Sequence, residues 1–315
     1  MIKDLVTFAL PAYKAKYLAA AINSILNQDY ENIELIIIND ASPENVDFIV
    51  SQFSDSRIKY YTNPQNAGAV NLVRNWNKCL SLAQGEYFVM ASDDDIYDCK
   101  FASTLIDLAH EAPEMDIFHC RVKIIDGNDC LVKMTPACPE FESGMEFIWH
   151  RLFQYREQFA PEFMCRTESL RQMQGFVSFP LAWFSDDATW DLLALKKGIG
   201  YSSKPLLNWR SSGINITTDR RYMLEKIDAT YQYFMWLKRQ LSSFSPADEI
   251  QECQKADVEK NWKALYSHYI KSILVNSRSQ DVWKLLFSRK RKKYDISIYL
   301  VIVYWAYRIK KQTGY

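Results

Sequence analysis

Three consecutive carboxylates, Asp93, Asp94 and Asp95, follow an apolar run at residues 86–90. Like charges this close raise one another's pKa values unless a cation lies between them. Mg²⁺ and Mn²⁺ favour carboxylate oxygens and readily share their remaining positions with phosphate oxygens. The cluster therefore predicts a divalent-cation site, against the alternative that the three acids cap the next helix or face water.

A second isolated carboxylate, Asp40, follows the almost wholly branched and apolar run at residues 33–38. Such a run is typical of a strand buried on both faces. Asp40 either binds a ligand at the end of this strand or forms an Asx turn. In the second case, Ser42 is expected to cap a helix whose first residue is Pro43.

Short apolar runs alternate with stretches of helical spacing through the first third of the chain. The expected strands are residues 5–10, 33–38, 58–61 and 86–90, and the expected helices include 17–26, 69–83 and 100–112. This alternation predicts the α/β class, with a mostly parallel central sheet and right-handed crossovers. Ligands of such sheets bind at the carboxyl ends of the strands, where Asp40 and the acidic cluster fall.

The alternation stops further along the chain. Strands are expected at residues 116–125 and 162–166, and a helix at residues 187–197. Residues 221–287 contain no glycine and one proline, Pro246, which predicts a helical appendage. We therefore expect a catalytic domain at residues 1–220 and a helical C-terminal region at residues 221–315.

Several short motifs occur in a specific order along residues 6–218. They are Pro11 with Tyr13, Asn39-Asp40-Ala41-Ser42, Asn66-Ala67-Gly68 with Arg74, Ser92-Asp93-Asp94-Asp95, Ser185-Asp186-Asp187, and Trp209-Arg210. In this order they resemble the family 2 glycosyltransferases. The resemblance implies the GT-A nucleotide-sugar fold and inverting transfer of a sugar from a UDP-sugar or dTDP-sugar to an acceptor hydroxyl, in cell-surface polysaccharide or lipid-linked glycan synthesis.

The resemblance also implies roles around the donor. Asp40 would accept the N3 proton of uracil or thymine, and the base and ribose would lie against Pro11, Ala12 and Tyr13. The nucleotide loop would be stabilised by Asn66, Gly68 and Arg74, although a turn followed by a surface helix also explains these three. Asp93 would contact the nucleotide, and Asp94 and Asp95 would bind Mg²⁺ or Mn²⁺, with Asp94 the first choice.

On the acceptor side, inversion needs a carboxylate that takes the hydroxyl proton. The resemblance assigns Asp187 as this general base and Asp186 as the residue that orients the acceptor or the neighbouring backbone. The alternative is a helix N-terminus carrying acids, which the helix dipole favours. Arg210 would neutralise the diphosphate, and Ser212 would offer a hydroxyl from a loop that closes over the donor.

The sequence departs from the usual family pattern at two places. Ser92 stands where the family usually has its first aspartate, so the register of metal ligands among Asp93, Asp94 and Asp95 is open. No histidine follows Arg210, where many relatives carry one.

Composition excludes some classes of partner. The 315 residues contain 38 basic and 38 acidic side chains, so no overall charge favours nucleic acid. Seven cysteines without a CxxC pair favour a reducing cytosol over a disulfide framework or a zinc site.

The C-terminus combines a basic run at residues 288–293 with an apolar run at residues 296–307. The apolar run is too short to span a bilayer of about 30 Å. It predicts peripheral contact with an anionic membrane, or else a helix packed on the appendage. We therefore expect a cytoplasmic protein on the inner face of a membrane. Two other functions stay open, a sugar nucleotidyltransferase and a non-catalytic relative that binds nucleotide sugar or membrane.

Overall fold

The computed structural model describes residues 1–68, 71–211, 219–302 and 304–305, which belong to two compact units. Unit 1 comprises Met1–Val177 with Asp186–Ser212, and unit 2 comprises Ser178–Ser185 with Gly213–Tyr315. A short segment before the acidic pair therefore belongs to unit 2, although the chain on both sides of it belongs to unit 1. The sequence-based boundary at residue 220 stays a prediction.

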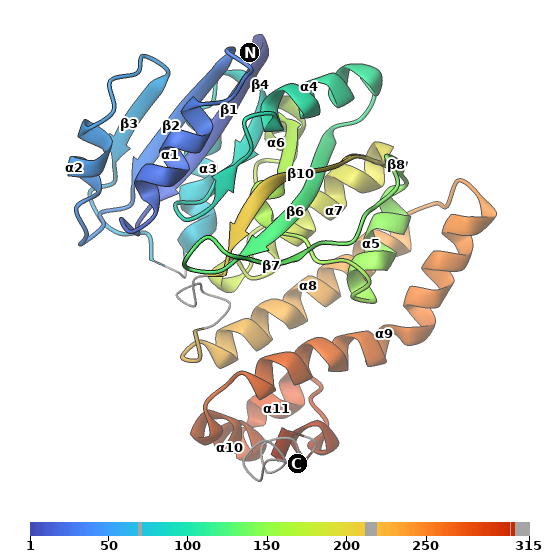
Figure 1. The fold of residues 1–315 in the computed structure, drawn as a ribbon. Helices are drawn as coiled ribbons and strands as arrows, with labels where there is room; N and C mark the ends of the chain where they lie inside the picture. Colours follow the sequence, from blue (N-terminus) through green and yellow to red (C-terminus); the bar gives the residue numbers. More distant parts are fainter. Residues whose placement is uncertain (69–70, 212–218, 303, 306–315) are drawn as a thin grey trace. The chain divides into compact units, whose positions relative to one another are not determined.

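Unit 1 is built on one mixed sheet (Figure 1), which in the described part of the chain has ten strands. They are β1 (Ile2–Ala12), β2 (Ile33–Asn39), β3 (Ile58–Thr62), β4 (Gly85–Met90), β5 (Ile96–Tyr97), β6 (Ile117–Ile125), β7 (Leu131–Met134), β8 (Phe141–Glu142), β9 (Phe163–Arg166) and β10 (Ile199–Arg210). The order is β3-β2-β1-β4-β9-β6-β10-β5, with β7 beside β6 and β8 beside β10.

The first four strands of the chain are parallel to one another, and β6 is parallel to β10. Strand β9 lies between these two groups and runs antiparallel to both β4 and β6. The predicted α/β class is confirmed, and the strands expected at residues 5–10, 33–38, 58–61 and 86–90 are all present.

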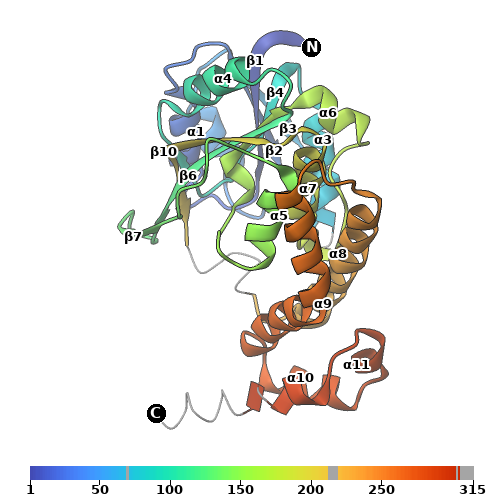
Figure 2. The ribbon, with the colours of Figure 1, turned by 90° about the vertical axis from the view of Figure 1, so that its right-hand side faces the viewer.

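Helices cover both faces of this sheet. In unit 1 they are α1 (Leu18–Leu26), α2 (Val46–Ser51), α3 (Leu72–Leu82), α4 (Phe101–Glu111), α5 (Gly144–Leu152), α6 (Thr167–Gln172) and α7 (Ser185–Lys197), with the 3₁₀ turn η2 (Ala160–Glu162). Helices α1 and α4 lie on one face, and α3, α6 and α7 lie on the other (Figures 1 and 2).

The core follows from alternation of side chains along the strands. Val6, Phe8 and Leu10 of β1 pack with the apolar sides of α1 and α4 in one buried cluster. All seven residues of β2 are buried, as its branched apolar sequence predicts. Strand β2 is therefore covered on both faces, and its pairing with β1, together with that of β1 with β4, sets the positions of their carboxyl ends.

One local prediction was wrong, and one alternative reading does not hold. Helix α2 begins at Val46 instead of Pro43, and the Ser42 hydroxyl accepts from Glu44 N at 3.0 Å without capping a helix. The acidic cluster does not cap a helix either, because Asp95 leads directly into β5.

Unit 2 contains the 3₁₀ turn η3 (Pro180–Ala182) and the helices α8 (Met223–Ser243), α9 (Glu249–Val275), α10 (Ser279–Phe287) and α11 (Arg289–Lys293). The appendage predicted to be helical is therefore a set of separate helices. Phe184 stacks on Tyr233 of α8 with ring centroids 4.5 Å apart, which anchors the segment 178–185 within this unit.

Candidate active site

The predicted donor residues gather at the carboxyl ends of β1, β2 and β4. Pro11 and Ala12 end β1, where Ala12 pairs with Asn39, and Asp40 follows directly. The main chain continues these contacts, since Asp40 N donates to Ala12 O at 3.0 Å and Ala91 N donates to Ala9 O at 2.8 Å. Tyr13 lies beyond them with 44 % of its surface exposed. The parallel register thus brings these residues to one edge of the sheet.

Asp40 is buried and held by the segment that follows β3. Its Oδ1 accepts from Asn63 Nδ2 at 2.7 Å and from Ala67 N at 3.0 Å, and its carbonyl accepts from Asn66 Nδ2 at 2.9 Å. Gly68 continues this turn with a φ of +67°, which favours glycine. The side chain that bonds the following backbone here is that of Asn39, since its Oδ1 accepts from Ser42 N three residues further on. The turn predicted around the nucleotide therefore wraps the Asp40 carboxylate.

Arg74 is exposed on α3. Close by, the buried Nδ2 of Asn75 has no hydrogen-bond partner among the residues that the structure describes, while its Oδ1 accepts from Asn63 Nδ2 at 3.1 Å. A buried amide donor without an acceptor is costly. Sequence reasoning missed Asn63 as a partner of Asp40, because nothing in the local pattern marks it.

All three carboxylates of the acidic cluster are buried and engaged. The Asp93 Oδ2 atom accepts from the main-chain N of Tyr13 and of Lys14, at 2.9 and 2.7 Å. Asp94 accepts from the Ser92 hydroxyl at 2.6 Å, and Asp95 accepts from Arg210 N at 2.7 Å. Ser92, which replaces the usual first aspartate, thus orients Asp94.

Lys14 is a site residue that sequence reasoning missed. Its ammonium lies 2.5 Å from Asp94 Oδ2 and 3.3 Å from Asp93 Oδ1. Burial lowers the pKa of Lys14, but the charges of Asp93 and Asp94 outweigh burial and raise it. One clue was available, because Lys14 lies two residues beyond the end of β1 and directly follows Tyr13.

The cluster remains short of positive charge. Burial raises the pKa of Asp93; Lys14 opposes that rise, and the charge of Asp94 adds to it. Burial and the charge of Asp94 raise the pKa of Asp95 well above its usual range. Buried carboxylate oxygens that resist ionisation for these reasons fit Mg²⁺ or Mn²⁺ in donor type and charge.

Arg210 lies beneath this cluster, with 1 % of its surface exposed. Its Nε donates to Asp94 O at 2.8 Å, its guanidinium contacts Asp129 at 2.5 Å, and it stacks 4.0 Å from the Tyr17 ring centroid. These contacts make Arg210 a support of the acidic segment, and its predicted role in neutralising diphosphate stays a prediction. Ser212 lies outside the described residues.

The acidic pair Asp186 and Asp187 begins α7, where the helix dipole favours acids. Asp187 is buried, and its Oδ1 accepts from Arg151 Nε at 2.6 Å and from Gln158 Nε2 at 2.8 Å. Part of the Asp186 residue reaches the surface, but its carboxyl group is desolvated by the surrounding protein, and this desolvation together with the charge of Asp187 raises its pKa to about 7.

The segment before this pair has an unusual backbone. Leu181, Ala182 and Phe184 all have positive φ, between 55° and 64°, although none is glycine. Such conformations cost of order 1–3 kcal/mol each and persist where packing enforces them. Lys226 of α8 lies 4.8 Å from the Trp183 ring centroid and adds to that packing.

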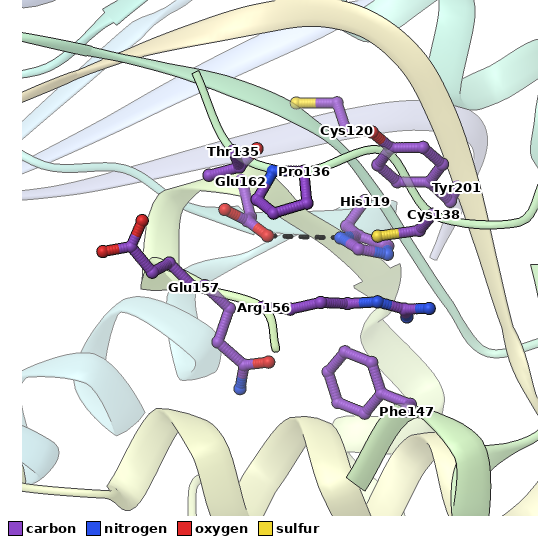
Figure 3. Close-up of a pocket in the computed structure, with 11 residues that line it drawn as sticks. His119, Cys120, Thr135, Pro136, Cys138, Phe147, Arg156, Glu157, Glu162 and Tyr201 are labelled. Carbon is purple, nitrogen blue, oxygen red and sulfur yellow. Dashed lines mark hydrogen bonds and ion pairs between the residues drawn. The ribbon is translucent and has the colours of Figure 1, made fainter. Parts of the chain in front are cut away.

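Figure 3 shows a small cavity of unit 1 around His119, Arg156 and Glu162. Its volume is about 10 Å³, room for about one water and too small for a nucleotide sugar. The His119 Nδ1 and Glu162 Oε1 atoms are 3.2 Å apart, and burial with the charge of Arg156 lowers the pKa of His119 to about 3. Gln158, which donates to Asp187, also lines this cavity. We therefore interpret the cavity as part of the packing that holds Gln158 in place.

A further acidic group includes Glu142, Glu146 and His150, whose potential ligand atoms lie within 4.8 Å of one another. Arg156 Nη1 already donates to both Glu142 carboxylate oxygens, at 2.5 and 2.6 Å. This ion pair neutralises the central carboxylate, so we assign no metal there.

Comparisons with known proteins indicate the family of the chain. The family described as "Glycosyl transferase family 2" matches residues 7–173, more than half of the chain. A similar curated protein is the Escherichia coli UDP-Glc:alpha-D-GlcNAc-diphosphoundecaprenol beta-1,3-glucosyltransferase WfgD, 39 % identical over 94 residues that cover 30 % of this chain and 36 % of WfgD. The chain thus matches about a third of the length of this relative.

Two solved structures share the fold at low sequence identity. S. aureus TarS 1-349 in complex with UDP-GlcNAc has a TM-score of 0.64 at 14 % identity, over 98 % of this chain and 92 % of TarS 1-349. The Pyrobaculum calidifontis mannosyltransferase PcManGT in complex with GDP-Man and Mn²⁺ has a TM-score of 0.57 at 13 % identity, over 97 % of this chain and 86 % of that one.

Proposed function

The chain belongs to glycosyl transferase family 2, and we propose that it transfers a sugar, with inversion, from a UDP-sugar or dTDP-sugar to an acceptor hydroxyl. The acceptor would be a growing cell-surface polysaccharide or a lipid-linked glycan. The observation that carries the proposal is the row of buried carboxylates at the carboxyl ends of β2 and β4, where sheets of this class bind nucleotides.

The donor half of the site supports a pyrimidine nucleoside diphosphate. The Asp40 carboxylate is fixed by Asn63 and Ala67, so it is oriented before a base arrives. Pro11, Ala12 and Tyr13 would line the base and ribose, and Asn66, Gly68 and Arg74 would hold the loop around them. The UDP-GlcNAc complex of TarS supports a uridine donor by analogy of fold.

For the metal, we propose that Asp94 and Asp95 would hold Mg²⁺ or Mn²⁺ and that Asp93 lies on the nucleotide side. A divalent cation bound there would neutralise charge that develops on the diphosphate as the glycosidic bond breaks. The Mn²⁺ complex of PcManGT supports this assignment. Arg210 would keep the acidic segment in place from below.

For the chemical step, we propose direct displacement. The acceptor oxygen forms a bond to the anomeric carbon while the bond from that carbon to the diphosphate oxygen breaks, and the nucleoside diphosphate leaves with the electron pair. The hydroxyl proton passes to Asp187, whose other oxygen is held by Arg151 and Gln158. Asp186 is the second candidate, because a pKa near 7 suits a general base at neutral pH.

The C-terminal helices support a peripheral membrane contact. Trp283 stacks on Phe287 of α10, and Trp283 also lies 5.0 Å from the Trp305 ring centroid. Tyr299 and Ile302 precede Trp305 at three-residue spacing in a helical stretch, so they share its side of the helix. Four of these five side chains are strongly exposed, Trp283 by 48 %, Phe287 by 80 %, Tyr299 by 71 % and Ile302 by 58 %.

Basic residues adjoin this exposed apolar face. Helix α11 has no buried residue and follows Phe287 after one serine, and Arg289, Lys290 and Lys292 are exposed on it. We name the four apolar and three basic side chains the tail surface. Its charge favours anionic lipid headgroups, at about 1 kcal/mol per basic residue near the surface. No helix in the described ranges is long and apolar enough to cross a membrane.

We therefore propose a cytoplasmic enzyme that is peripheral on the inner face of a membrane.

One experiment tests the proposed function against both alternatives. The purified chain is incubated with UDP-sugars, dTDP-sugars and Mn²⁺, with and without lipid extract as acceptor, and release of nucleoside diphosphate is measured. A transferase releases the diphosphate and depends on acceptor. A nucleotidyltransferase would instead exchange pyrophosphate, and a non-catalytic relative would bind donor without turnover.

A further inference from the structure

Lys14 and the neighbouring donors already occupy the two carboxylates that precede Asp95. Asp93 and Asp94 present four oxygens, and each has a donor. Asp93 Oδ2 takes the main-chain N–H groups of the loop, Asp94 Oδ1 takes the Ser92 hydroxyl, and the remaining two oxygens face the Lys14 ammonium. A cation that binds Asp94 Oδ2 must therefore displace Lys14.

The position of Lys14 is fixed by the same cluster that it neutralises. The main-chain N of Lys14 donates to Asp93 at 2.7 Å. The loop after β1 is therefore bound to Asp93 through its backbone, while the Lys14 ammonium lies closest to Asp94. The side chain is 24 % exposed, whereas those of Asp93 and Asp94 are 6 % and 5 % exposed. The ammonium thus has a path to solvent that the carboxylates lack, and it can leave while its backbone stays in place.

We propose that Lys14 is a built-in counter-cation that competes with the divalent metal for Asp94, so that metal binds tightly only together with the diphosphate of the donor. The proposal rests on the proposed function, because it takes the diphosphate as the ligand that changes the balance of charge.

Electrostatics gives the reason. Without nucleotide, Lys14 and a divalent cation are like charges that seek the same oxygen, and each weakens binding of the other. A diphosphate brings new negative oxygens that either cation can contact, so the competition is relieved. By linkage, metal then raises the affinity for diphosphate by the same factor as diphosphate raises the affinity for metal.

A matched pair of variants tests this. Lys14→Gln removes the ammonium, and Lys16→Gln removes the same charge from the same loop at an exposed side chain that lies over the Tyr17 ring instead of the carboxylates. Binding of Mn²⁺ alone, measured by electron paramagnetic resonance of free Mn²⁺, should become at least tenfold tighter in Lys14→Gln and stay unchanged in Lys16→Gln.

The second measurement is the factor by which UDP tightens Mn²⁺ binding. In the parent chain, UDP should tighten Mn²⁺ binding by a large factor, and in Lys14→Gln that factor should fall about tenfold or more. Lys14→Arg keeps the charge and should retain the weak Mn²⁺ binding of the parent, which separates charge from misfolding if Lys14→Gln is unstable. Equal or weaker Mn²⁺ binding in a folded Lys14→Gln would overturn the proposal.

The two proposals fail differently. If no form of the chain binds UDP with or without metal, the proposed function is wrong, yet tighter Mn²⁺ binding by Lys14→Gln would still establish the competition at Asp94. If UDP binds and Mn²⁺ affinity is the same in all variants, the proposed function stands and the competition does not.

Discussion

Arg151 Nε donates to the Oδ1 atom of Asp187 at 2.6 Å. Gln158 donates to the same oxygen, and within the described residues no hydrogen bond reaches Oδ2. One oxygen of this carboxylate is therefore held by the protein, and we propose that the other takes the proton of the acceptor hydroxyl. Orientation of one oxygen so that the other can take a proton is the arrangement that a general base requires.

Replacement of this carboxylate should separate chemistry from binding. We expect Asp187→Asn to reduce transfer by about a hundredfold or more, as loss of a positioned general base does, with UDP affinity nearly unchanged. Initial rates and calorimetry on the same preparation measure both quantities. Transfer at the parental rate would shift the role to Asp186, and in that case the parental rate should fall below about pH 7 as Asp186 becomes protonated.

The raised pKa of Asp186 also predicts a pH effect on stability. Its folded value of about 7 lies above the ordinary value of 3.8, so the folded protein holds a proton that the unfolded chain releases. The contribution of Asp186 to stability therefore falls as pH rises from about 4 to about 7. Asp186→Asn should raise the melting temperature relative to the parent more at pH 8 than at pH 5.

The control for this measurement is the exposed acid Glu168 of α6. Glu168→Gln should change the melting temperature equally at both pH values. If Asp186→Asn behaves in the same way as this control, the carboxyl of Asp186 ionises normally in the folded protein.

The sequence predicted the location of those site residues that directly follow a buried strand. Asp40 and the acidic cluster were placed correctly at strand ends, because apolar runs mark buried strands and parallel strands share an edge. Strand β10 was harder to predict, since polar residues and Pro205 interrupt its sequence. Its pairing with β6 is irregular between Ser202 and Leu207. This irregularity depends on the neighbouring strand, so the sequence of β10 alone does not predict it.

Long-range partners could not be predicted from the sequence. Lys14 and Asp94 are 80 residues apart, and their contact depends on how the loop after β1 folds over the end of β4. The burial of Arg210 likewise depends on Asp129 and Tyr17 from distant segments. No periodicity or spacing reports such contacts, because they arise from tertiary packing alone.

The two halves of the donor site should respond differently to mutation. Asp94→Ala should weaken UDP binding in the presence of Mn²⁺ more than it weakens uridine binding, because the proposed metal contacts the diphosphate. Asp40→Ala should weaken both ligands, since its carboxylate would contact the base. Calorimetry with UDP and with uridine decides this, and an equal loss for both ligands in Asp94→Ala would contradict the metal role of that residue.

The last prediction concerns the tail surface. Lys290→Gln combined with Lys292→Gln should weaken binding to vesicles of phosphatidylglycerol and phosphatidylcholine by about tenfold or more, because two charges near the membrane contribute about 2 kcal/mol. Lys238→Gln with Arg239→Gln removes two exposed charges from α8 and should leave binding unchanged. The charge-dependent part should also weaken with salt, since the Debye length shrinks from about 10 Å at 0.1 M to about 3 Å at 1 M.

The apolar part of the same surface needs its own control. Phe287→Ser should reduce vesicle flotation, whereas Phe48→Ser, which changes an equally apolar side chain that is 59 % exposed on α2, should not. Point variants are preferable to truncation, because Tyr294, Val301 and Tyr304 are buried and their loss would destabilise unit 2. Flotation is measured with the full chain in both cases. If parent and variants all stay in the soluble fraction at low salt, the tail surface does not bind anionic membranes, and its exposed aromatic residues serve another contact.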